Sequence, residues 1–450
     1  MSDDAHEDSL TPWTSLVGVD AIRVAPLGRP VIAEMAIPGS KSVSNRALIL
    51  AAMAEGTTEL TGLLRSDDTY WCTDALGRLG ADIALDGMRA RVTGIGRRRP
   101  RSGPLHVGSA GTLARFLPPF LAAGDAGSWR VTASRQMSKR PVAALFEALR
   151  AGGARIECPD VANCYPAVIA GDTFAGGRLA MSGKVSSQFI SGVLLGAAQS
   201  RNGVDLAVDG GIVQGDYVRI TLDAMRHFGA TVDADDALTR FRVAPTGYRA
   251  RDLAIEADAS TATYFAALAA VTRGRVTLTN LPPVTRQPDY GFLAILERLG
   301  CRVERRADRT IIACDQKLKG GLSVDMRPLS DATLTLAALA PFADAPITMT
   351  GVAHIRHHES DRLAAMSASL AKLGIRCEEH ADGLTVHPGT PRFAVLDTFE
   401  DHRVAMSLAV LGVAGSGVEL KDPACVSKTC PTFFELLSGL GVATELRAKK

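Results

Sequence analysis

Two kinds of helix-like segment alternate along the chain. The first kind is amphipathic, ends in Leu-Gly-Ala or a close variant, and runs into a strand-like pattern, as in DALGRLGADI and EALRAGGARI. Glycine suits the end of such a helix because the chain commonly turns there through a left-handed residue. The segment recurs at intervals of roughly 72 residues, which predicts a repeated helix–strand unit. Its closing glycines are Gly80, Gly153, Gly229, Gly300, Gly374 and Gly441.

The second kind of segment is rich in Ala and Leu and keeps the same period. Examples are ALILAAMAEGTTELTG and AMSLAVLGVAGSGVELKD, in which the helix pattern gives way to a turn and a β-branched strand. A helix that is apolar on most faces should be buried, whereas the first kind carries charges for a solvent-facing side. The turns fall at Gly56, Gly127, Gly203, Gly274, Ala345 and Gly417. The two registers together predict an α/β fold of six repeats in two lobes, with helices inside and sheets outside.

The length and net charge of the chain favour several domains and argue against some kinds of partner. The chain of 450 residues is too long for one ordinary core, which favours at least two domains. Its formal net charge of +2 argues against nucleic acid as the partner. The longest apolar runs, 47–54 and 190–198, are too short to span a bilayer. We expect no membrane association, and a disordered tail over residues 1–20 because its start is acidic and polar.

Cysteine and histidine usage gives no sign of a metal. The eight cysteines form no C-x-x-C pair, and the histidines lack the spacing of a zinc site. Scattered cysteines of this kind are typical of reduced thiols. The sequence therefore predicts a cytoplasmic location and no metal or other cofactor.

One segment has the composition of an anion site. Pro38–Arg46 carries a glycine turn, Lys41, Ser42 and Arg46 directly before an apolar helix pattern. The free N–H groups and the dipole of a helix start favour an anion, and the cationic side chains add full charges. The G-x-x-x-x-G-K-[ST] spacing of a P-loop is absent. A capped helix with solvated basic residues is the alternative.

Three further segments repeat this arrangement in the first half of the chain. Gly108–Arg115 places small residues, Gly111 among them, before a helix start with Arg115 one turn in. Arg135–Pro141 and Val185–Phe189 place basic, hydroxyl and amide side chains before the next two helix patterns. Gly111 would allow a ligand to approach the backbone closely. Each segment can also be explained by ordinary helix capping or a solvated loop.

Charged motifs also precede helices in the second half. They are Arg356–Arg362, Glu400–Arg403 and Asp422–Thr429, and Asp331 heads another apolar helix pattern. Asp331 has two interpretations, a helix cap or a reactive carboxylate. Arg is well suited to bidentate contacts with phosphate and carboxylate. So many cations at helix starts indicate small, highly charged anionic substrates, and we expect their site between the lobes because ligands favour such crevices.

These motifs resemble those of the 5-enolpyruvylshikimate-3-phosphate (EPSP) synthase family. PGSKSVSNRALILAA, GSAGTLAR, KRP, VSSQF, HESDRL, DHRVAM and SKT occur in the family order between about Pro38 and Phe434. The resemblance implies two lobes, each an inside-out α/β barrel of three repeats. It also places the first strand with the C-terminal lobe. The expected domains are therefore 39–256 for the N-terminal lobe, and 21–38 with 257–450 for the C-terminal lobe.

The resemblance assigns roles to individual residues. It implies catalytic roles for Asp331, Glu359, Lys41 and His402. It implies that shikimate 3-phosphate is held by Lys41, Ser42, Arg46, Ser186, Ser187, Gln188, Gln214, Asp331 and His358. It implies that phosphoenolpyruvate is held by Lys41, Gly111, Arg115, Arg140, Gln188, Arg362, Arg403 and Lys428. A monomer that needs no cofactor is expected.

The family reaction fits these side chains. The C5 hydroxyl of the acceptor attacks C2 of phosphoenolpyruvate while C3 gains a proton, and phosphate then leaves the tetrahedral intermediate. Asp331, assisted by Lys41, would accept the hydroxyl proton, and Glu359 would supply the proton to C3. The cationic side chains would stabilise the leaving phosphate. Gly111 would leave room beside phosphoenolpyruvate for the inhibitor glyphosate.

Several positions depart from the family pattern and keep alternatives open. Gln214–Tyr217 stands where Ser-Lys-Pro-Tyr is frequent, and His358 stands where Lys is frequent. Ser109, Phe116 and His354 replace a common Asn, Pro and Asn. A paralogue with a related acceptor, or a non-catalytic anion-binding protein on the same fold, are the alternatives. A UDP-N-acetylglucosamine enolpyruvyl transferase is disfavoured, because the Arg-Pro segment carries no Cys and Lys41 is followed by Ser.

Overall fold

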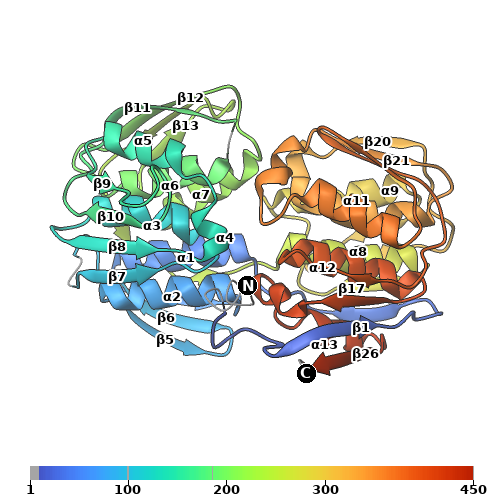
Figure 1. Ribbon diagram of the computed structural model, residues 1–450. Coiled ribbons are helices and arrows are strands. Elements are labelled where there is room, and N and C mark those ends of the chain that lie inside the picture. The colour runs from blue at the N-terminus through green and yellow to red at the C-terminus, as the bar shows by residue number, and fades with distance from the viewer. Residues whose placement is uncertain (1–9, 99–100, 185, 449–450) are drawn as a thin grey trace. The chain divides into compact units, whose positions relative to one another are not determined.

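The computed structural model describes residues 10–98, 101–184 and 186–448. It divides into two compact units (Figure 1). Unit 1 comprises Met1–Trp13 and Gly39–Ile255, and unit 2 comprises Thr14–Pro38 and Glu256–Lys450. Each unit has a hydrophobic core of its own.

Unit 1 is built from helices and short strands. Its helices are α1 (Lys41–Met53), α2 (Asp67–Leu79), α3 (Leu113–Ala122), α4 (Arg135–Ser138), α5 (Ala143–Ala151), α6 (Ser187–Ala197) and α7 (Asp216–His227). Its strands are β3 (Ala54–Glu55), β4 (Thr57–Thr61), β5 (Asp82–Asp86), β6 (Arg89–Thr93), β7 (Gly103–His106), β8 (Ser128–Thr132), β9 (Ile156–Glu157), β10 (Ala167–Ala170), β11 (Gly177–Ser182), β12 (Val204–Asp209), β13 (Val232–Ala234), β14 (Arg240–Val243), β15 (Tyr248–Arg249) and β16 (Leu253–Ala254).

Unit 2 is built in the same way but also uses 3₁₀ helices. Its α-helices are α8 (Ala259–Val271), α9 (Phe292–Arg298), α10 (Thr333–Leu339), α11 (Arg362–Lys372), α12 (His402–Ala414) and α13 (Phe433–Gly439). Its 3₁₀ helices are η2 (Pro288–Gly291), η3 (Arg327–Ala332), η4 (Ala340–Phe342), η5 (Ala353–His357) and η6 (Pro423–Lys428). Its strands are β1 (Val19–Val24), β2 (Ile32–Met35), β17 (Arg275–Leu278), β18 (Arg302–Arg305), β19 (Thr310–Ala313), β20 (Leu322–Asp325), β21 (Ile347–Thr350), β22 (Cys377–His380), β23 (Gly383–Val386), β24 (Val395–Leu396), β25 (Val418–Lys421) and β26 (Thr444–Ala448).

The sheets repeat one pairing pattern. Among the described residues, the strands form six four-stranded sheets and one two-stranded sheet. In each four-stranded sheet one edge strand pairs in parallel with its neighbour and the other two pairings are antiparallel, as in β7-β8-β10-β9 and β20-β21-β23-β22. Three of these sheets belong to each unit. This topology agrees with the α/β fold of repeated units expected from the sequence.

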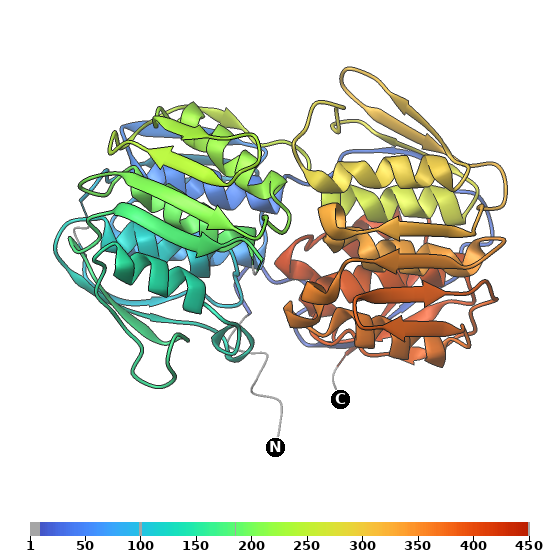
Figure 2. The same ribbon diagram turned by 90° about the horizontal axis from the view of Figure 1, so that it is seen from above.

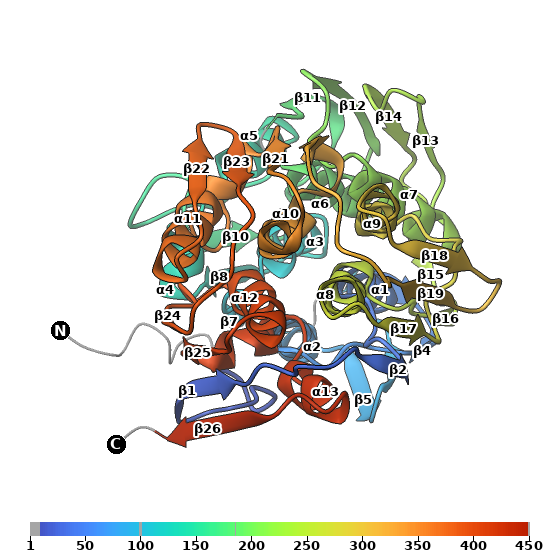
Figure 3. The same ribbon diagram turned by 90° about the vertical axis from the view of Figure 1, so that its right-hand side faces the viewer.

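The Ala/Leu-rich segments form the inner helices. In unit 1 these are α1, α3 and α6, and in unit 2 they are α8, α10 and α12, with almost every residue buried. Within unit 2 the three inner helices contact one another, and Figure 3 shows them side by side with strands around them. Figure 2 shows strands covering helices in each unit from another side. The apolar surface of these helices is thus removed from water by neighbouring helices and sheets, which stabilises the fold.

The amphipathic segments end as the sequence predicts. Among the glycines that close them, Gly80, Gly229 and Gly374 have φ values of 111°, 84° and 77°, in the left-handed region. Gly153, Gly300 and Gly441 lie in the same region. A side chain at φ values of this kind strains the backbone, so glycine is needed to turn the chain from helix to strand.

Unit 2 is discontinuous in sequence. Strand β1 lies between β25 and β26 and pairs antiparallel with both, while β2 pairs in parallel with β17. In Figure 1 the dark blue β1 lies beside the red β26. The first and last strands of the described chain therefore share one sheet.

The expected disordered tail is wrong for residues 10–20. The Thr11 hydroxyl donates to Asp67, and Trp13 packs edge-on against Tyr70 with the Arg65 guanidinium over its ring. The Ser15 backbone N–H donates to the Ser427 hydroxyl. An aromatic side chain and hydrogen bonds to distant parts of the sequence thus order a segment whose polar composition had suggested disorder. Residues 1–9 of the expected tail lie outside the described residues.

The described residues contain no membrane-spanning helix: none of their helices is long and apolar enough to cross a membrane. In the same ranges, no group of three or more His, Cys, Asp or Glu side chains is placed to hold a metal ion.

Candidate functional site

The starts of the inner helices carry most of the candidate residues. Lys41 is the first residue of α1, Ser187 the first of α6 and His402 the first of α12. Side-chain caps fix these starts: Ser40, Ser186 and Asp401 each accept a hydrogen bond from a backbone N–H in the first turn. In each helix the capping positions the following side chains and leaves the positive end of the helix dipole beside them.

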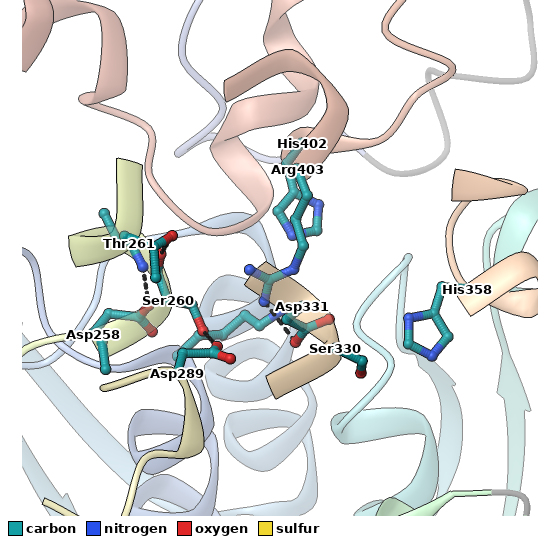
Figure 4. Close-up of polar contacts among 12 residues, drawn as sticks. Asp258, Ser260, Thr261, Asp289, Ser330, Asp331, His358, His402 and Arg403 are labelled. Carbon is teal, nitrogen blue, oxygen red and sulfur yellow. Dashed lines mark hydrogen bonds and ion pairs between the residues drawn. The ribbon is translucent and has the colours of Figure 1, made fainter. Parts of the chain in front are cut away.

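Unit 2 contains an arginine–carboxylate cluster of Asp331, Glu359, Arg362, Asp401 and Arg403. Arg362 Nη1 donates to Asp331 Oδ1 at 2.9 Å, Nη2 donates to Glu359 Oε2 at 2.8 Å, and Nε donates to Asp401 Oδ2 at 2.8 Å. Arg403 Nη2 donates to Asp331 Oδ2 at 2.8 Å. Arg362 is 1% exposed and Asp401 0%. The sequence-predicted residues of this cluster come from η3, α11, α12 and the loops before them, and the fold brings them together (Figure 4 shows Asp331 and Arg403).

All five N–H groups of Arg362 have partners. Two further bonds complete the set: Nη1 donates to His358 Nδ1 at 3.1 Å, and Nη2 donates to Asp401 Oδ1 at 3.4 Å. Since guanidinium has no acceptor, His358 accepts with an unprotonated Nδ1. In this arrangement a substrate anion can bind Arg362 only by displacing one of its partners.

The charges around Asp331 decide its protonation. Burial alone raises the pKa of Asp331, but the Arg403 and Arg362 guanidinium groups outweigh burial and hold that pKa well below its usual range. Burial alone lowers the pKa of Arg362, but Asp401, Glu359 and Asp331 raise it above its usual value. Asp331 is therefore a carboxylate over the whole physiological pH range. It does not cap the helix, because α10 begins at Thr333 with no side-chain cap.

His402 and Lys428 lie in the same unit. His402 is buried beside Asp401, with 3.8 Å between Nδ1 and Oδ1. Lys428 is buried at the end of η6, and η6 packs against α12. His402 thus belongs to the helix that carries Arg403, and Lys428 belongs to the 3₁₀ helix packed against it.

Unit 1 contains a glycine–arginine cluster of Gly111, Arg115, Arg140 and Gln188. A Cβ atom at Gly111 would lie 3.2 Å from Arg140 Nη1, 3.3 Å from Arg115 Nη1 and 3.7 Å from Gln188 Oε1. Arg115 Nη1 also donates to the Gly111 carbonyl at 3.1 Å. The missing side chain thus lets two guanidinium groups converge over one stretch of backbone.

Arg46 is a buried cation in unit 1. It is 1% exposed and donates to the Thr221 hydroxyl and to the carbonyls of Ser42 and Tyr217. Its guanidinium also lies 5.1 Å from the centre of the Phe116 ring. Burial lowers the pKa of Arg46 to about 10. No described carboxylate forms an ion pair with it, so its charge is balanced only by neutral dipoles and a ring face.

The remaining candidates of unit 1 lie close to helix starts. Lys41 Nζ lies 3.4 Å from Asp68 Oδ2, and the Asp68 side chain is buried. Gln214 has φ 54° just before α7, and its Nε2 is a buried donor with no partner among the described residues. Ser186 Oγ accepts from the Gln188 N–H at 3.2 Å. Ser42 lies in the first turn of α1.

Sequence reasoning missed several acidic side chains. Asp401 holds Arg362 and caps α12, Asp68 faces Lys41, and Asp289 lies in η2 against Ser260. Asp401 belonged to a recognised motif, so an acidic residue directly before His402 and Arg403 was a usable signal. Asp68 and Asp289 carried no such signal, because only the folded chain brings them to their partners.

The comparisons with known proteins agree with the motifs. The family model for EPSP synthase (3-phosphoshikimate 1-carboxyvinyltransferase) matches residues 27–437. A 3-phosphoshikimate 1-carboxyvinyltransferase 2 of Halalkalibacterium halodurans is 48% identical over 97% of this chain and 98% of its own length. A 3-phosphoshikimate 1-carboxyvinyltransferase of Trichormus variabilis is 37% identical over 92% of this chain and 98% of its own.

Solved structures share the fold. An EPSP synthase of Acinetobacter baumannii matches with a TM-score of 0.81 at 25% identity, over 95% of this chain and 99% of that one. The enolpyruvyl transferase NikO of Streptomyces tendae matches with a TM-score of 0.78 at 17% identity, over 96% and 100% of the two chains. The second likeness shows the fold alone.

Proposed function

This chain belongs to the EPSP synthase family, and we propose that the two clusters described above carry out that family's reaction. The chain transfers the enolpyruvyl group of phosphoenolpyruvate to the 5-hydroxyl of shikimate 3-phosphate and releases phosphate. The observation that carries the residue assignment is Asp331, a buried carboxylate held in its ionised form between two arginines.

Asp331 is the proposed general base. An anionic substrate that binds Arg403 competes with Asp331 for the guanidinium, so the pKa of the carboxyl rises when the site fills. A carboxylate with a higher pKa accepts a proton from the attacking hydroxyl more readily. Substrate binding would thus convert a tightly paired carboxylate into a working base.

Glu359 is the proposed acid for C3 of phosphoenolpyruvate. Its side chain is 9% exposed and bonded to Arg362, so its position is fixed by the same guanidinium that holds Asp331. Arg362 itself gives all five donors to protein groups. We therefore assign Arg362 first to orienting the carboxylates, and to phosphoenolpyruvate only after one partner is exchanged for the substrate.

The cations of unit 1 are proposed to bind substrate anions. Arg115 and Arg140 meet over Gly111, which suits the carboxylate or phosphate of phosphoenolpyruvate. Arg46 lacks a described carboxylate partner, and the unused Nε2 donor of Gln214 suits a phosphate oxygen of the acceptor. Lys41, Ser42, Ser186, Ser187 and Gln188 complete the proposed set, and His358, His402, Arg403 and Lys428 are the proposed contributors from unit 2.

The departures at Gln214 and His358 bear on the acceptor. An amide in place of a hydroxyl, and an imidazole in place of an ammonium, both keep hydrogen-bonding capacity but change the length and basicity of the side chain. We expect the phosphate of shikimate 3-phosphate to bind the buried cation and the amide donor of unit 1. A related acceptor with an anionic group remains the second candidate, favoured by these two substitutions alone.

A phosphate-release assay tests the proposal. The full chain is mixed with phosphoenolpyruvate and one of several acceptors: shikimate 3-phosphate, shikimate or UDP-N-acetylglucosamine. We expect phosphate release and an enolpyruvyl ether only with shikimate 3-phosphate. Release with another acceptor and none with shikimate 3-phosphate would establish the paralogue, and binding of both substrates without turnover would establish an anion-binding protein.

A monomeric state and a cytoplasmic location belong to the same proposal. All eight cysteines carry free thiols, which suits a reducing compartment. Light scattering of the purified chain should give the mass of one chain, and cell fractionation should recover it with cytoplasmic markers.

A further inference from the structure

Two cysteines of unit 2 face each other at the end of a hairpin. Strands β18 and β19 are antiparallel, and their register ends with Arg302 opposite Ala313. Continued by one residue, that register places Cys301 opposite Cys314. Directly opposite residues project from the same side of a sheet, so both side chains reach the same part of the core.

The backbone hydrogen bonds of Cys301 and Cys314 show that the two residues are a non-hydrogen-bonded pair. The Cys301 N–H donates to the Leu296 carbonyl, and the Cys314 N–H donates to the Gly274 carbonyl. The two residues therefore exchange no backbone hydrogen bonds. Opposite residues of that kind have Cα atoms about 4.5 Å apart in antiparallel sheets, within the range of roughly 4.4–6.8 Å that a disulfide bridges.

The two thiols influence each other. The neighbouring Cys301 thiol lowers the pKa of Cys314 to about 7, while Cys314 and burial raise the pKa of Cys301. The nearby Arg273 guanidinium lowers the pKa of Cys314 further. One sulfur is thus a partial thiolate at neutral pH, and thiolate is the form that attacks disulfides.

A cavity lies beside a residue bonded to Cys314. Cys314 Sγ donates to the Gln316 carbonyl at 3.6 Å, and Gln316, Arg273 and Lys317 line a cavity of about 350 Å³. Neither cysteine lines that cavity, and Cys301 is 6% exposed and Cys314 3%, so a reagent reaches the sulfurs only when this part of unit 2 opens locally. The two basic side chains favour an anionic reagent there.

We propose that Cys301 and Cys314 are a modification site. An anionic low-molecular-weight disulfide such as glutathione disulfide oxidises their two thiols reversibly to an intramolecular disulfide. The Cys314 thiolate attacks one reagent sulfur, forms a mixed disulfide and releases one glutathione thiolate. Cys301 loses its proton and attacks the Cys314 sulfur, which releases the second glutathione. Two electrons pass from the protein thiols to the reagent, and dithiothreitol reverses the reaction.

Four of the other six cysteines are made less reactive by burial. Burial raises the pKa of Cys72, Cys425, Cys430 and Cys377, which keeps these sulfurs as poorly reactive thiols. Among the described cysteines whose pKa is clearly shifted, Cys314 alone is shifted downward.

The test uses the full chain and glutathione disulfide. The protein is treated, its remaining thiols are alkylated, and its peptides are identified by mass spectrometry. We expect a peptide linked through Cys301 and Cys314 and the loss of two alkylatable thiols. We also expect the melting temperature to rise by several degrees, and dithiothreitol to return it to its original value. Full alkylation of both cysteines after treatment, or a link between another pair, would overturn the proposal.

Two variants separate the roles of the sulfurs. In Cys301→Ser the second step is impossible, so glutathione should stay on Cys314 as a stable adduct. In Cys314→Ser no adduct should form at Cys301, because its sulfur is buried and burial keeps its pKa raised even without Cys314. The opposite distribution of adducts would contradict the assigned order, and the wild-type measurement stands even if a variant folds poorly.

Discussion

At the scale of single residues, the candidate chemistry depends on charges that are buried and paired. Arg362 bonds to three carboxylates at once, while Arg46 is buried with no described carboxylate beside it. Pairing keeps the first cation and its partners in fixed positions. The unpaired cation retains its full capacity to attract a substrate anion. The two arginines therefore suit different tasks, orientation and binding.

Asp331 can be tested through its effect on turnover. Replacement by Ala or Asn removes the proposed base, so kcat should fall by about 100-fold or more, while the dissociation constant for shikimate 3-phosphate changes only a few-fold. Rapid-quench kinetics and calorimetry measure the two quantities. Asp325→Asn is the control, because Asp325 forms an exposed ion pair with Arg327. Equal losses of turnover and acceptor binding would indicate a structural role.

Gly111 can be tested through the two guanidinium groups over it. In Gly111→Ala the new methyl group would lie 3.2 Å from Arg140 Nη1 and 3.3 Å from Arg115 Nη1, so both side chains must shift by a few tenths of an ångström. We expect KM for phosphoenolpyruvate and the inhibition constant of glyphosate to rise several-fold. Gly77→Ala, with no atom near its new methyl group, is the control. An unchanged inhibition constant would remove Gly111 from the donor site.

The buried carboxyl group of Asp289 should make the stability of the folded protein depend on pH. It is 1% exposed, and burial followed by the charge of Asp331 raises its pKa from 3.8 to about 7. Asp331, Arg403 and Asp258 face it, and Ser260 donates to it (Figure 4). Because the folded state binds this proton more tightly, its contribution to stability is full below about pH 4. That contribution is lost as the pH rises through 7.

Asp289→Asn should therefore gain stability relative to the wild type as the pH rises. The amide resembles the protonated acid and does not ionise, so the difference in unfolding free energy should increase between pH 4 and 8. At about 1.4 kcal/mol per tenfold change in proton affinity, the increase approaches about 4 kcal/mol. Urea unfolding at several pH values measures it. Asp308→Asn, at an exposed carboxylate, should show no such increase, and a flat difference for Asp289→Asn would refute the raised pKa.

At the scale of elements, the fold is set by the contrast between inner and outer helices. Inner helices are buried on all faces, whereas α2 and α7 bury one side and expose the other. The periodic pattern carried this information, and it predicted both helix types and their left-handed glycine ends. It did not predict the 3₁₀ helices η2 to η6 or two-residue strands such as β16. Such short elements depend on tertiary contacts more than on local periodicity.

For the candidate site too, the sequence pattern revealed only residues that lie close together in the chain. Residues at helix starts were found because cap, glycine and arginine lie within one turn of sequence. Their partners lie much further away: Asp401 is 39 positions from Arg362, and Thr221 is 175 from Arg46. Long-range pairing was therefore beyond a local pattern.

The role of the glycines that end the outer helices can be tested by comparing one of them with a glycine inside a helix. Gly229 has φ 84° and only an ordinary contact at 3.9 Å for a new Cβ, so Gly229→Ala should destabilise through the backbone by about 1–2 kcal/mol. Gly77 lies inside α2, where Gly77→Ala should stabilise by about 0.5–1 kcal/mol. Chemical unfolding of both variants provides the comparison. Destabilisation of equal size in both would show that packing, not the left-handed backbone, sets the effect.

At the scale of the whole molecule, the hydrophobic cores of the two units differ in how they draw on the sequence. The core of unit 1 is built within Gly39–Ile255, whereas the core of unit 2 includes Ile22 and Val24 of β1. Strand β1 pairs on both sides, so its removal leaves two exposed sheet edges. Unit 2 therefore depends on a segment from the other end of the sequence.

Fragments test this dependence. We expect residues 39–255 alone to unfold cooperatively, and residues 256–450 alone to lack a cooperative transition. A permuted chain in which 14–38 follows residue 450 through a flexible linker should restore that transition. Circular dichroism during urea titration distinguishes these outcomes. Cooperative unfolding of 256–450 by itself would show that β1 and β2 are dispensable.

The position of β1 between β25 and β26 also matters while the protein is being synthesised. β1 leaves the ribosome roughly 400 residues before β25, an interval of about 20–80 s at translation rates of roughly 5–20 residues per second. During that time unit 1 can fold, but β1 has neither neighbour and can pair with other nascent chains. Asp20 and Arg23 within β1 place charges on the waiting strand, a composition that discourages such pairing.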